Sequence, residues 1–223
     1  MRRARAVLVD LYGTLVHDDG EPLAAACCHL AARARHLDPA LDPAALREAW
    51  DARLWELAEP AHGAGFRGLF ELTAAALGDV LAERGLGALP AGEALQGLRL
   101  AWRRPPAFPD AHAFLDAVRA AGLPVCLVSD ADRADVEAVL GLHGLVLDAV
   151  VTSEDARAYK PRPEPFARGL AALGVAAGEA VHVGDSLACD VEGARAMGIS
   201  AVHLQRGGTA VPDLAAAARV VLG

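Results

Sequence analysis

Short apolar runs alternate with longer amphipathic segments over most of the chain. Each run is rich in small or β-branched apolar residues and stops abruptly at a polar residue or a glycine, as buried strands do. The predicted strands are Ala6–Val9, Val125–Val128, Ala149–Val151, Val181–Val183, Ala201–Leu204 and Val220–Leu222.

Helical patterns separate most of these runs, and each is followed by a glycine that can end it. The predicted helices are Asp110–Ala121, Asp132–Leu142, Pro163–Leu173 and Leu187–Met197, closed by Gly122, Gly144, Gly174 and Gly198. Strands that alternate with helices predict an α/β fold with a doubly wound, parallel sheet.

The stretch between the first strand and Pro105-Pro106 has helical periodicity and no convincing strand. Its candidate helices are Pro22–Leu37, Pro43–Ala58, Gly68–Arg84 and Gly92–Trp102. We therefore predict an α/β core made of residues 1–17 and 105–223, with an inserted α-helical cap subdomain over residues 18–104.

Composition narrows the classes of function. Hydrophobic residues make up 54% of the 223 residues and aromatic residues only 4%, which indicates a globular protein of small-residue helices packed on a sheet.

The net charge of -8 and the lack of a basic stripe argue against nucleic acid as a partner, and no segment approaches the roughly 20 apolar residues that span a membrane. The four cysteines have no paired metal-ligand spacing. We expect a cytoplasmic monomer or homodimer with a small-molecule substrate.

Polar residues follow several predicted strands, at the sheet edge where parallel α/β proteins bind ligands. Asp10 follows the first strand, Ser129 the second and Asp185 the fourth, while Lys160 follows the third after a short loop. A carboxylate such as Asp10 can act as a nucleophile, because a covalent ester divides one hard displacement into two easier ones.

The other residues suit the support of an anionic substrate. Thr14 and Ser129 can donate hydrogen bonds to anionic oxygens, and Lys160 can hold the nucleophile and neutralise charge in the transition state. Asp10 and Asp185 together form a hard oxygen site suited to Mg²⁺, which Asp190 completes or supports. We interpret Asp130 and Asp132 as helix caps.

Four motifs in order resemble those of the haloacid dehalogenase (HAD) superfamily. They are Asp10-Leu11-Tyr12-Gly13-Thr14-Leu15, then Ser129, then Lys160-Pro161, then Gly184-Asp185-Ser186-Leu187-Ala188-Cys189-Asp190. The resemblance covers nearly the whole chain, and it implies a Rossmann-like core, a helical cap that excludes water, and a hydrolase that begins its reaction at Asp10.

Two features of the motifs favour different hydrolases within this superfamily. Its phosphatases normally carry a second aspartate, the general acid and base, where this chain has Tyr12, and a tyrosine there is typical of the 2-haloacid dehalogenases. Retention of both Asp185 and Asp190 instead favours a Mg²⁺-dependent phosphatase, for which the metal ligand at position 12 would be the Tyr12 carbonyl. We give more weight to the two carboxylates, because clustered carboxylates without a metal repel one another. The prediction is a phosphatase for a small phosphate monoester, with a 2-haloacid dehalogenase and a catalytically impaired metal- and anion-binding protein as alternatives.

Overall fold

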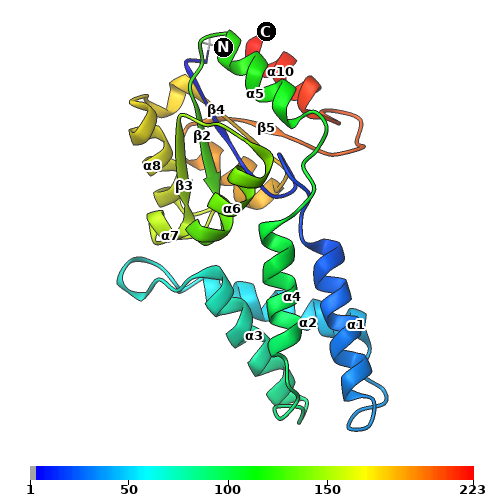
Figure 1. Cartoon of the computed structure of the whole chain (residues 1–223). Coiled ribbons are helices and arrows are strands. Elements are labelled where there is room, and N and C mark those ends of the chain that lie inside the picture. The colour runs from blue at the N-terminus through cyan, green and yellow to red at the C-terminus, as the bar shows by residue number, and fades with distance from the viewer. Residues whose placement is uncertain (1–3) are drawn as a thin grey trace. The chain divides into compact units, whose positions relative to one another are not determined.

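The computed structural model describes residues 4–223, and the chain divides into two compact units (Figure 1). The first is an α/β unit formed by the described residues up to His17 together with Pro106–Gly223, and the second is a helical unit, Asp18–Pro105. The two crossings between the units lie side by side within the α/β unit, because the His17 N–H donates to the Pro106 carbonyl at 2.9 Å. The His17 ring also stacks on Phe108, with the ring centroids 4.1 Å apart.

The α/β unit contains a five-stranded parallel sheet in the order β3-β2-β1-β4-β5. The strands are β1 (Ala6–Val9), β2 (Val125–Ser129), β3 (Ala149–Thr152), β4 (Ala180–Gly184) and β5 (Ser200–His203). The central strand is β1, whose Val9 lies in register with Leu127 on one side and Val183 on the other. The predicted doubly wound parallel sheet is confirmed.

Helices cover both faces of this sheet. The helices of the α/β unit are α5 (Ala111–Ala120), α6 (Arg133–His143), α7 (Ser153–Ala156), α8 (Pro163–Leu173), η2 (Ala177–Glu179), η3 (Leu187–Glu192), α9 (Gly193–Ala196) and α10 (Leu214–Leu222). Alternate strand residues point to opposite faces, so Val7 and Val9 join one apolar cluster with α5, α6 and α10, while Leu8 joins a second with α8 and α9.

The helical unit consists of α1 (Gly20–Ala34), α2 (Pro43–Ala58), η1 (Gly63–Gly65), α3 (Leu69–Glu83) and α4 (Gly92–Arg103). Asp42 caps α2, since its carboxylate accepts hydrogen bonds from the backbone N–H groups of Ala44 and Ala45. Trp50 is buried in the apolar interior, and its indole N–H donates to the Thr73 carbonyl at 2.9 Å. A search of the described residues finds no helix with both the length and the apolar character to cross a membrane.

Two predicted elements differ from the structure. The prediction of a strand at Val220–Leu222 is wrong, because these residues form the last turn of α10. That helix starts at Asp213, whose carboxylate accepts from the Ala216 N–H at 2.6 Å, and it continues through alanines that favour a helix. The predicted helix over Leu187–Met197 begins instead as the π-helix η3, in which the Ser186 carbonyl accepts from both Asp190 and Val191. Such π turns often occur at functional sites.

Candidate active site

The carboxyl ends of three neighbouring strands form the candidate site. Asp10 directly follows the central strand, and its N–H donates to the Val183 carbonyl at 3.0 Å. Since β2 and β4 flank β1, Ser129 at the end of β2 and Asp185 just after β4 lie at the same edge. The topology therefore places the predicted strand-end residues together.

Lys160 supplies a buried positive charge at this edge. Its side chain is 4% exposed, and Nζ donates to Asp10 Oδ1 at 2.7 Å and to Asp190 Oδ1 at 2.6 Å. Burial lowers the pKa of Lys160, but attraction to Asp10 and Asp190 outweighs this effect, and the net pKa lies well above its ordinary value. The ammonium group thus stays charged and bridges two carboxylates.

Three carboxylates lie together here, and Lys160 contacts two of them. Asp10, Asp185 and Asp190 each offer an oxygen that lies within 4.8 Å of the others. Burial raises the pKa of Asp10, and repulsion from the other two carboxylates adds to the rise against the pull of Lys160. Burial and repulsion from Asp190 likewise raise the pKa of Asp185. A divalent cation would relieve this excess of negative charge, and hard carboxylate oxygens are the donors that Mg²⁺ prefers, so the residues fit a magnesium site.

Two glycines let these carboxylates approach the backbone closely. Gly13 has a φ of +78°, and a Cβ there would lie 2.3 Å from Asp185 Oδ2. A Cβ on Gly184 would lie 2.3 Å from Asp190 Cγ. Any larger residue at either position would displace a carboxylate of the cluster.

The predicted substrate-binding hydroxyls are both buried at this edge of the sheet. Thr14 Oγ1 donates to Asp185 Oδ1 at the long distance of 3.4 Å. Ser129 Oγ has no hydrogen-bond partner among the described residues, which leaves it able to donate to a bound anion. Tyr12, at the position of the usual acid and base, is half-buried and packs against apolar core residues.

Asp190 is held by more donors than the sequence indicated. Its Oδ1 accepts from His182 Nε2 at 2.9 Å as well as from Lys160, and its Oδ2 accepts from the Ser186 N–H at 3.0 Å. Although burial opposes it, attraction to Lys160 and the hydrogen bond from His182 hold the pKa of Asp190 below its usual range. The sequence does not predict this contact of His182, whose one signal is a polar residue in the otherwise apolar run Ala180–Gly184.

Asp130 supports the lysine rather than a helix, so its interpretation as a cap is wrong. Its Oδ1 accepts from the backbone N–H of Lys160 at 2.9 Å, and burial raises the pKa of Asp130 to about 6. Asp132 does occupy the N-cap position of α6, with an extended backbone. The Asp130 carboxylate thereby supplies the acceptor that a buried backbone N–H needs.

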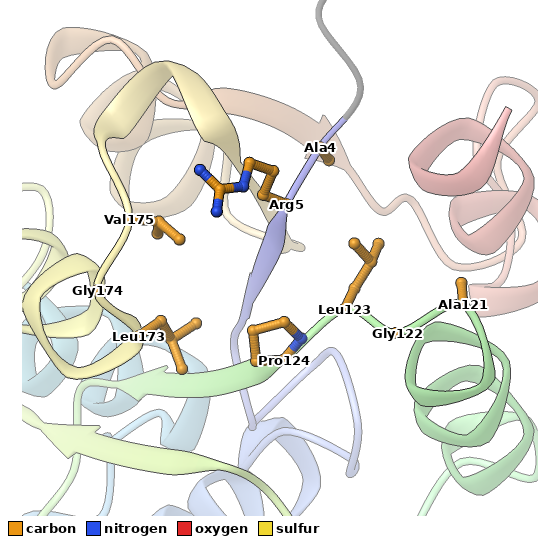
Figure 2. Close-up of a pocket in the computed structure, with 9 residues that line it drawn as sticks. All are labelled: Ala4, Arg5, Ala121, Gly122, Leu123, Pro124, Leu173, Gly174 and Val175. Atoms are coloured by element: carbon orange, nitrogen blue, oxygen red, sulfur yellow. The ribbon is translucent and has the colours of Figure 1, made fainter.

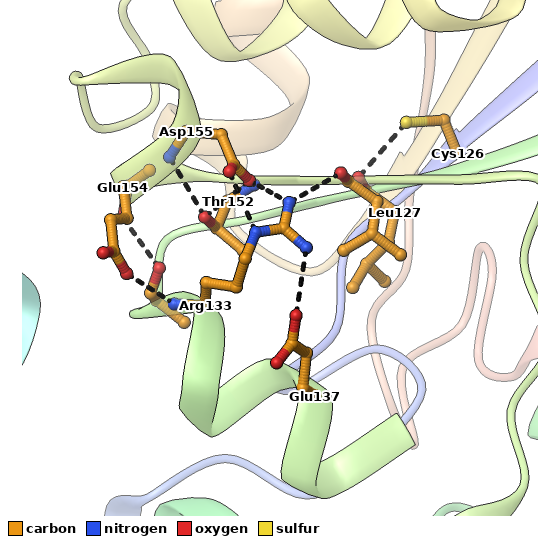
Figure 3. A network of polar contacts seen from close by, with 10 residues as sticks. Cys126, Leu127, Arg133, Glu137, Thr152, Glu154 and Asp155 are labelled. Atoms are coloured by element: carbon orange, nitrogen blue, oxygen red, sulfur yellow. Dashed lines mark hydrogen bonds and ion pairs between the residues drawn. The ribbon is translucent and has the colours of Figure 1, made fainter. Parts of the chain in front are cut away.

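A polar network locks the segment after β2 to the segment after β3 (Figure 3). Arg133 on α6 makes a two-point contact with Asp155 on α7, in which Nε lies 2.9 Å from Oδ1 and Nη2 also contacts Oδ2. The Arg133 N–H donates to Glu154 at 2.8 Å, and Ser153 Oγ donates to the Ala131 carbonyl at 3.1 Å. These contacts fix the start of the loop that carries Lys160.

The opposite edge of the sheet carries a pocket of about 400 Å³ at the amino ends of β1 and β2 (Figure 2). Arg5 is the one charged residue in its described lining, and it already pairs with Glu179 at 2.8 Å. Reactive groups therefore gather at the carboxyl edge and not here.

The comparison with protein families agrees with this geometry. The model of the haloacid dehalogenase-like hydrolases matches residues 4–198. The chain belongs to this family. As a haloacid dehalogenase-like hydrolase it is an enzyme of the HAD superfamily, and its sheet with helices on both faces is the fold of that superfamily.

Curated relatives of this HAD hydrolase include both phosphatases and dehalogenases. A phosphoserine phosphatase of Thermus thermophilus is 39% identical over 109 residues, which are 47% of this chain and 43% of that protein. A (S)-2-haloacid dehalogenase of Burkholderia cepacia is 32% identical over 113 residues, 50% of this chain and 48% of that protein. The matches thus span less than half of each relative.

Solved structures extend the similarity over nearly all of this chain. An L-2-haloacid dehalogenase covers 99% of this chain and is itself covered completely, with a TM-score of 0.72 and 26% identity. A second dehalogenase, with a TM-score of 0.74 over 100% of this chain and 99% of its own, is 23% identical and shows the shared fold alone.

Proposed function

We propose that the protein is a Mg²⁺-dependent phosphatase that acts on a small phosphate monoester through Asp10. The observation that carries this proposal is the cluster of Asp10, Asp185 and Asp190, in which Lys160 contacts only Asp10 and Asp190. Asp10, Asp185 and the Tyr12 carbonyl would hold the ion, with Asp190 in support. When bound, Mg²⁺ supplies positive charge that neutralises the phosphate and the developing negative charge.

The chain's own residues would then carry two displacements. An Asp10 oxygen attacks phosphorus, the bond to the leaving oxygen breaks, and that oxygen takes its proton from solvent, because Tyr12 stands where the usual acid would be. Water next attacks the phosphoryl group on Asp10, which releases inorganic phosphate and restores the carboxylate. Ser129 donates to a phosphate oxygen, and Lys160 keeps Asp10 oriented. General acid catalysis is typically worth about 10²- to 10⁴-fold, so we expect esters with good leaving groups to react best.

A 2-haloacid dehalogenase is the second candidate, favoured by Tyr12 and by the dehalogenases among the relatives. In that reaction Asp10 attacks the carbon that bears the halogen, the halide leaves without a proton, and water hydrolyses the resulting ester. The third candidate is a binding protein that keeps the metal and anion site without turnover.

One panel assay separates the three candidates. Purified protein, Asp10→Asn and Asp185→Asn are each incubated with phosphate monoesters and 2-haloacids, in MgCl₂ or in EDTA, while phosphate and halide release are measured. A phosphatase releases phosphate only with Mg²⁺, and loses this activity in both variants. Halide release that persists in EDTA and in Asp185→Asn would overturn the proposal of a phosphatase. If neither phosphate nor halide were released and calorimetry showed that Mg²⁺ binds, the result would favour the binding protein.

A further inference from the structure

His182 is a polar side chain in the middle of a buried strand. It is 0% exposed on β4, in register with Leu8 and Ala201 of the neighbouring strands. Its strand neighbours Val181 and Val183 point to the opposite face, into the larger apolar cluster. An apolar residue would fill this place without loss of hydration, so a histidine here needs a compensating contact.

That contact is with Asp190. His182 Nε2 lies 2.9 Å from Asp190 Oδ1, and the Phe166 ring meets the imidazole edge-on, with centroids 5.3 Å apart and an interplanar angle of 88°. Because a carboxylate oxygen only accepts, Nε2 must carry the hydrogen. The other ring nitrogen, Nδ1, is buried without a hydrogen-bond partner in the described part of the chain.

Through Asp190 the imidazole influences the nucleophile. Asp190 Oδ1 accepts from both His182 and Lys160, and the same Nζ donates to Asp10. Three donors therefore fix the Asp190 carboxylate, and the carboxylate in turn fixes the ammonium group 2.7 Å from Asp10 Oδ1. Without the imidazole, Oδ1 would have Lys160 as its single donor and would draw the ammonium away from Asp10.

We propose that His182 is a positioning residue, which acts through Asp190 and Lys160 to hold the Asp10 nucleophile in its reactive orientation. The proposal rests on Asp10 as the nucleophile of a HAD hydrolase, and it holds whether phosphate or halide is released. In this role the imidazole is a hydrogen-bond donor of fixed direction.

The test compares substitutions that differ in the donor they keep. His182→Gln places an amide N–H about as far from the backbone as Nε2, whereas His182→Asn is too short and His182→Leu has no donor. With the substrate identified by the panel assay, kcat should fall on the order of 10- to 100-fold in His182→Leu and His182→Asn, the range found when the outer hydrogen-bond partner of a metal ligand is removed. KM should stay within a few-fold, and His182→Gln should recover most of kcat.

Two controls separate positioning from packing. Val181→Ala shortens a buried side chain of the same strand on the opposite face, and should lower the melting temperature with kcat unchanged. In an Asp190→Asn background, His182→Leu should produce little further loss, because the two residues act in one chain. Independent losses that multiply, or a Gln variant no better than Leu, would overturn the proposal.

A measurement without turnover keeps this proposal distinct from the proposed function. Nitrogen-15 NMR of the imidazole should report a neutral ring protonated at Nε2 in the wild-type protein and a mixture of tautomers in Asp190→Asn. A wild-type ring protonated at Nδ1 would refute the positioning role even if the enzyme were active. The Nε2–H form in a protein that turns over neither substrate class would leave the hydrogen bond established and count against the proposed function alone.

Discussion

The α/β unit and the helical unit differ in what they bury. The α/β unit buries Asp10, Lys160, Asp190 and His182 in one connected network. In the described helical unit the one buried polar side chain is Thr73, whose hydroxyl donates to the carbonyl of Leu69 in its own helix.

The ion pairs of the helical unit lie at its surface instead. Arg53 contacts Glu83 at 2.7 Å, and the glutamate side chain is 59% exposed. Surface pairs of this kind contribute little to stability, whereas breaking a buried pair is expensive. Apolar burial therefore holds the helical unit together, while the α/β unit keeps buried charge for chemistry.

The largest effect should follow from Asp10→Asn. The amide keeps an oxygen that can accept from Lys160 but is no nucleophile, so we expect activity to fall by about 10⁴-fold or more with the fold retained. Initial rates on the preferred substrate, with circular dichroism as the check of folding, measure this. Asp42→Asn in the helical unit is the matched control and should keep its activity. If Asp10→Asn kept a tenth of the wild-type rate, Asp10 would not be the nucleophile.

Lys160→Met should give the largest change in stability. It leaves Asp10, Asp185 and Asp190 without their ammonium group, and loss of one partner of a buried pair costs about 3 to 5 kcal/mol. Urea unfolding in EDTA measures this change. Arg53→Met removes a surface cation of the helical unit and should change the midpoint much less. Equal losses of stability in the two variants would contradict the claim that buried charge contributes more to stability than surface charge.

Asp130→Asn should alter how stability depends on pH. Burial raises the pKa of Asp130 from 3.8 to about 6 in the folded state, so between these values the native protein keeps a proton that the unfolded chain has lost. This contribution to stability is complete below pH 3.8 and is lost as the pH rises through about 6. Asn keeps an oxygen for the Lys160 N–H and does not titrate. The difference in melting temperature between wild type and variant should therefore change with pH over this range; a constant difference would contradict the shift.

The smallest effect should come from Asp42→Ala in the helical unit. The substitution removes the acceptor for two N–H groups at the start of α2, and the loss of such a cap costs about 1 kcal/mol. Denaturant unfolding measures it. Asp42→Asn keeps the acceptor and should lose at most a few tenths of a kcal/mol. If Asp42→Ala were as destabilising as Lys160→Met, the helical unit would depend on polar contacts after all.

Much of the fold could be predicted because local patterns and tertiary packing agree. The helix Pro163–Leu173 begins with a proline and ends at Gly174, whose φ is +65°, and its predicted bounds match the structure. At Val220–Leu222 the two disagree. The β-branched pair suggests a strand, but the cap Asp213, seven residues before Val220, and the alanines that follow it start a helix.

The candidate site could be predicted only where its residues follow strands in the sequence. Asp10, Ser129 and Asp185 stand at strand ends, so their meeting follows from the parallel topology. The partners of Lys160 depend on how two loops fold against each other. Asp130 looked like a cap, and His182 like one position of a strand, because their contacts are long-range.

The hydrogen bond between His17 and Pro106 makes the helical unit exchangeable. The chain leaves and re-enters the α/β unit at neighbouring points, since the His17 N–H and the Pro106 carbonyl are 2.9 Å apart. A short turn, or another helical segment, could join the same two points with little loop-closure entropy and no shift in the register of β1. The positions of Asp10 and Lys160 therefore do not depend on which segment joins these two points.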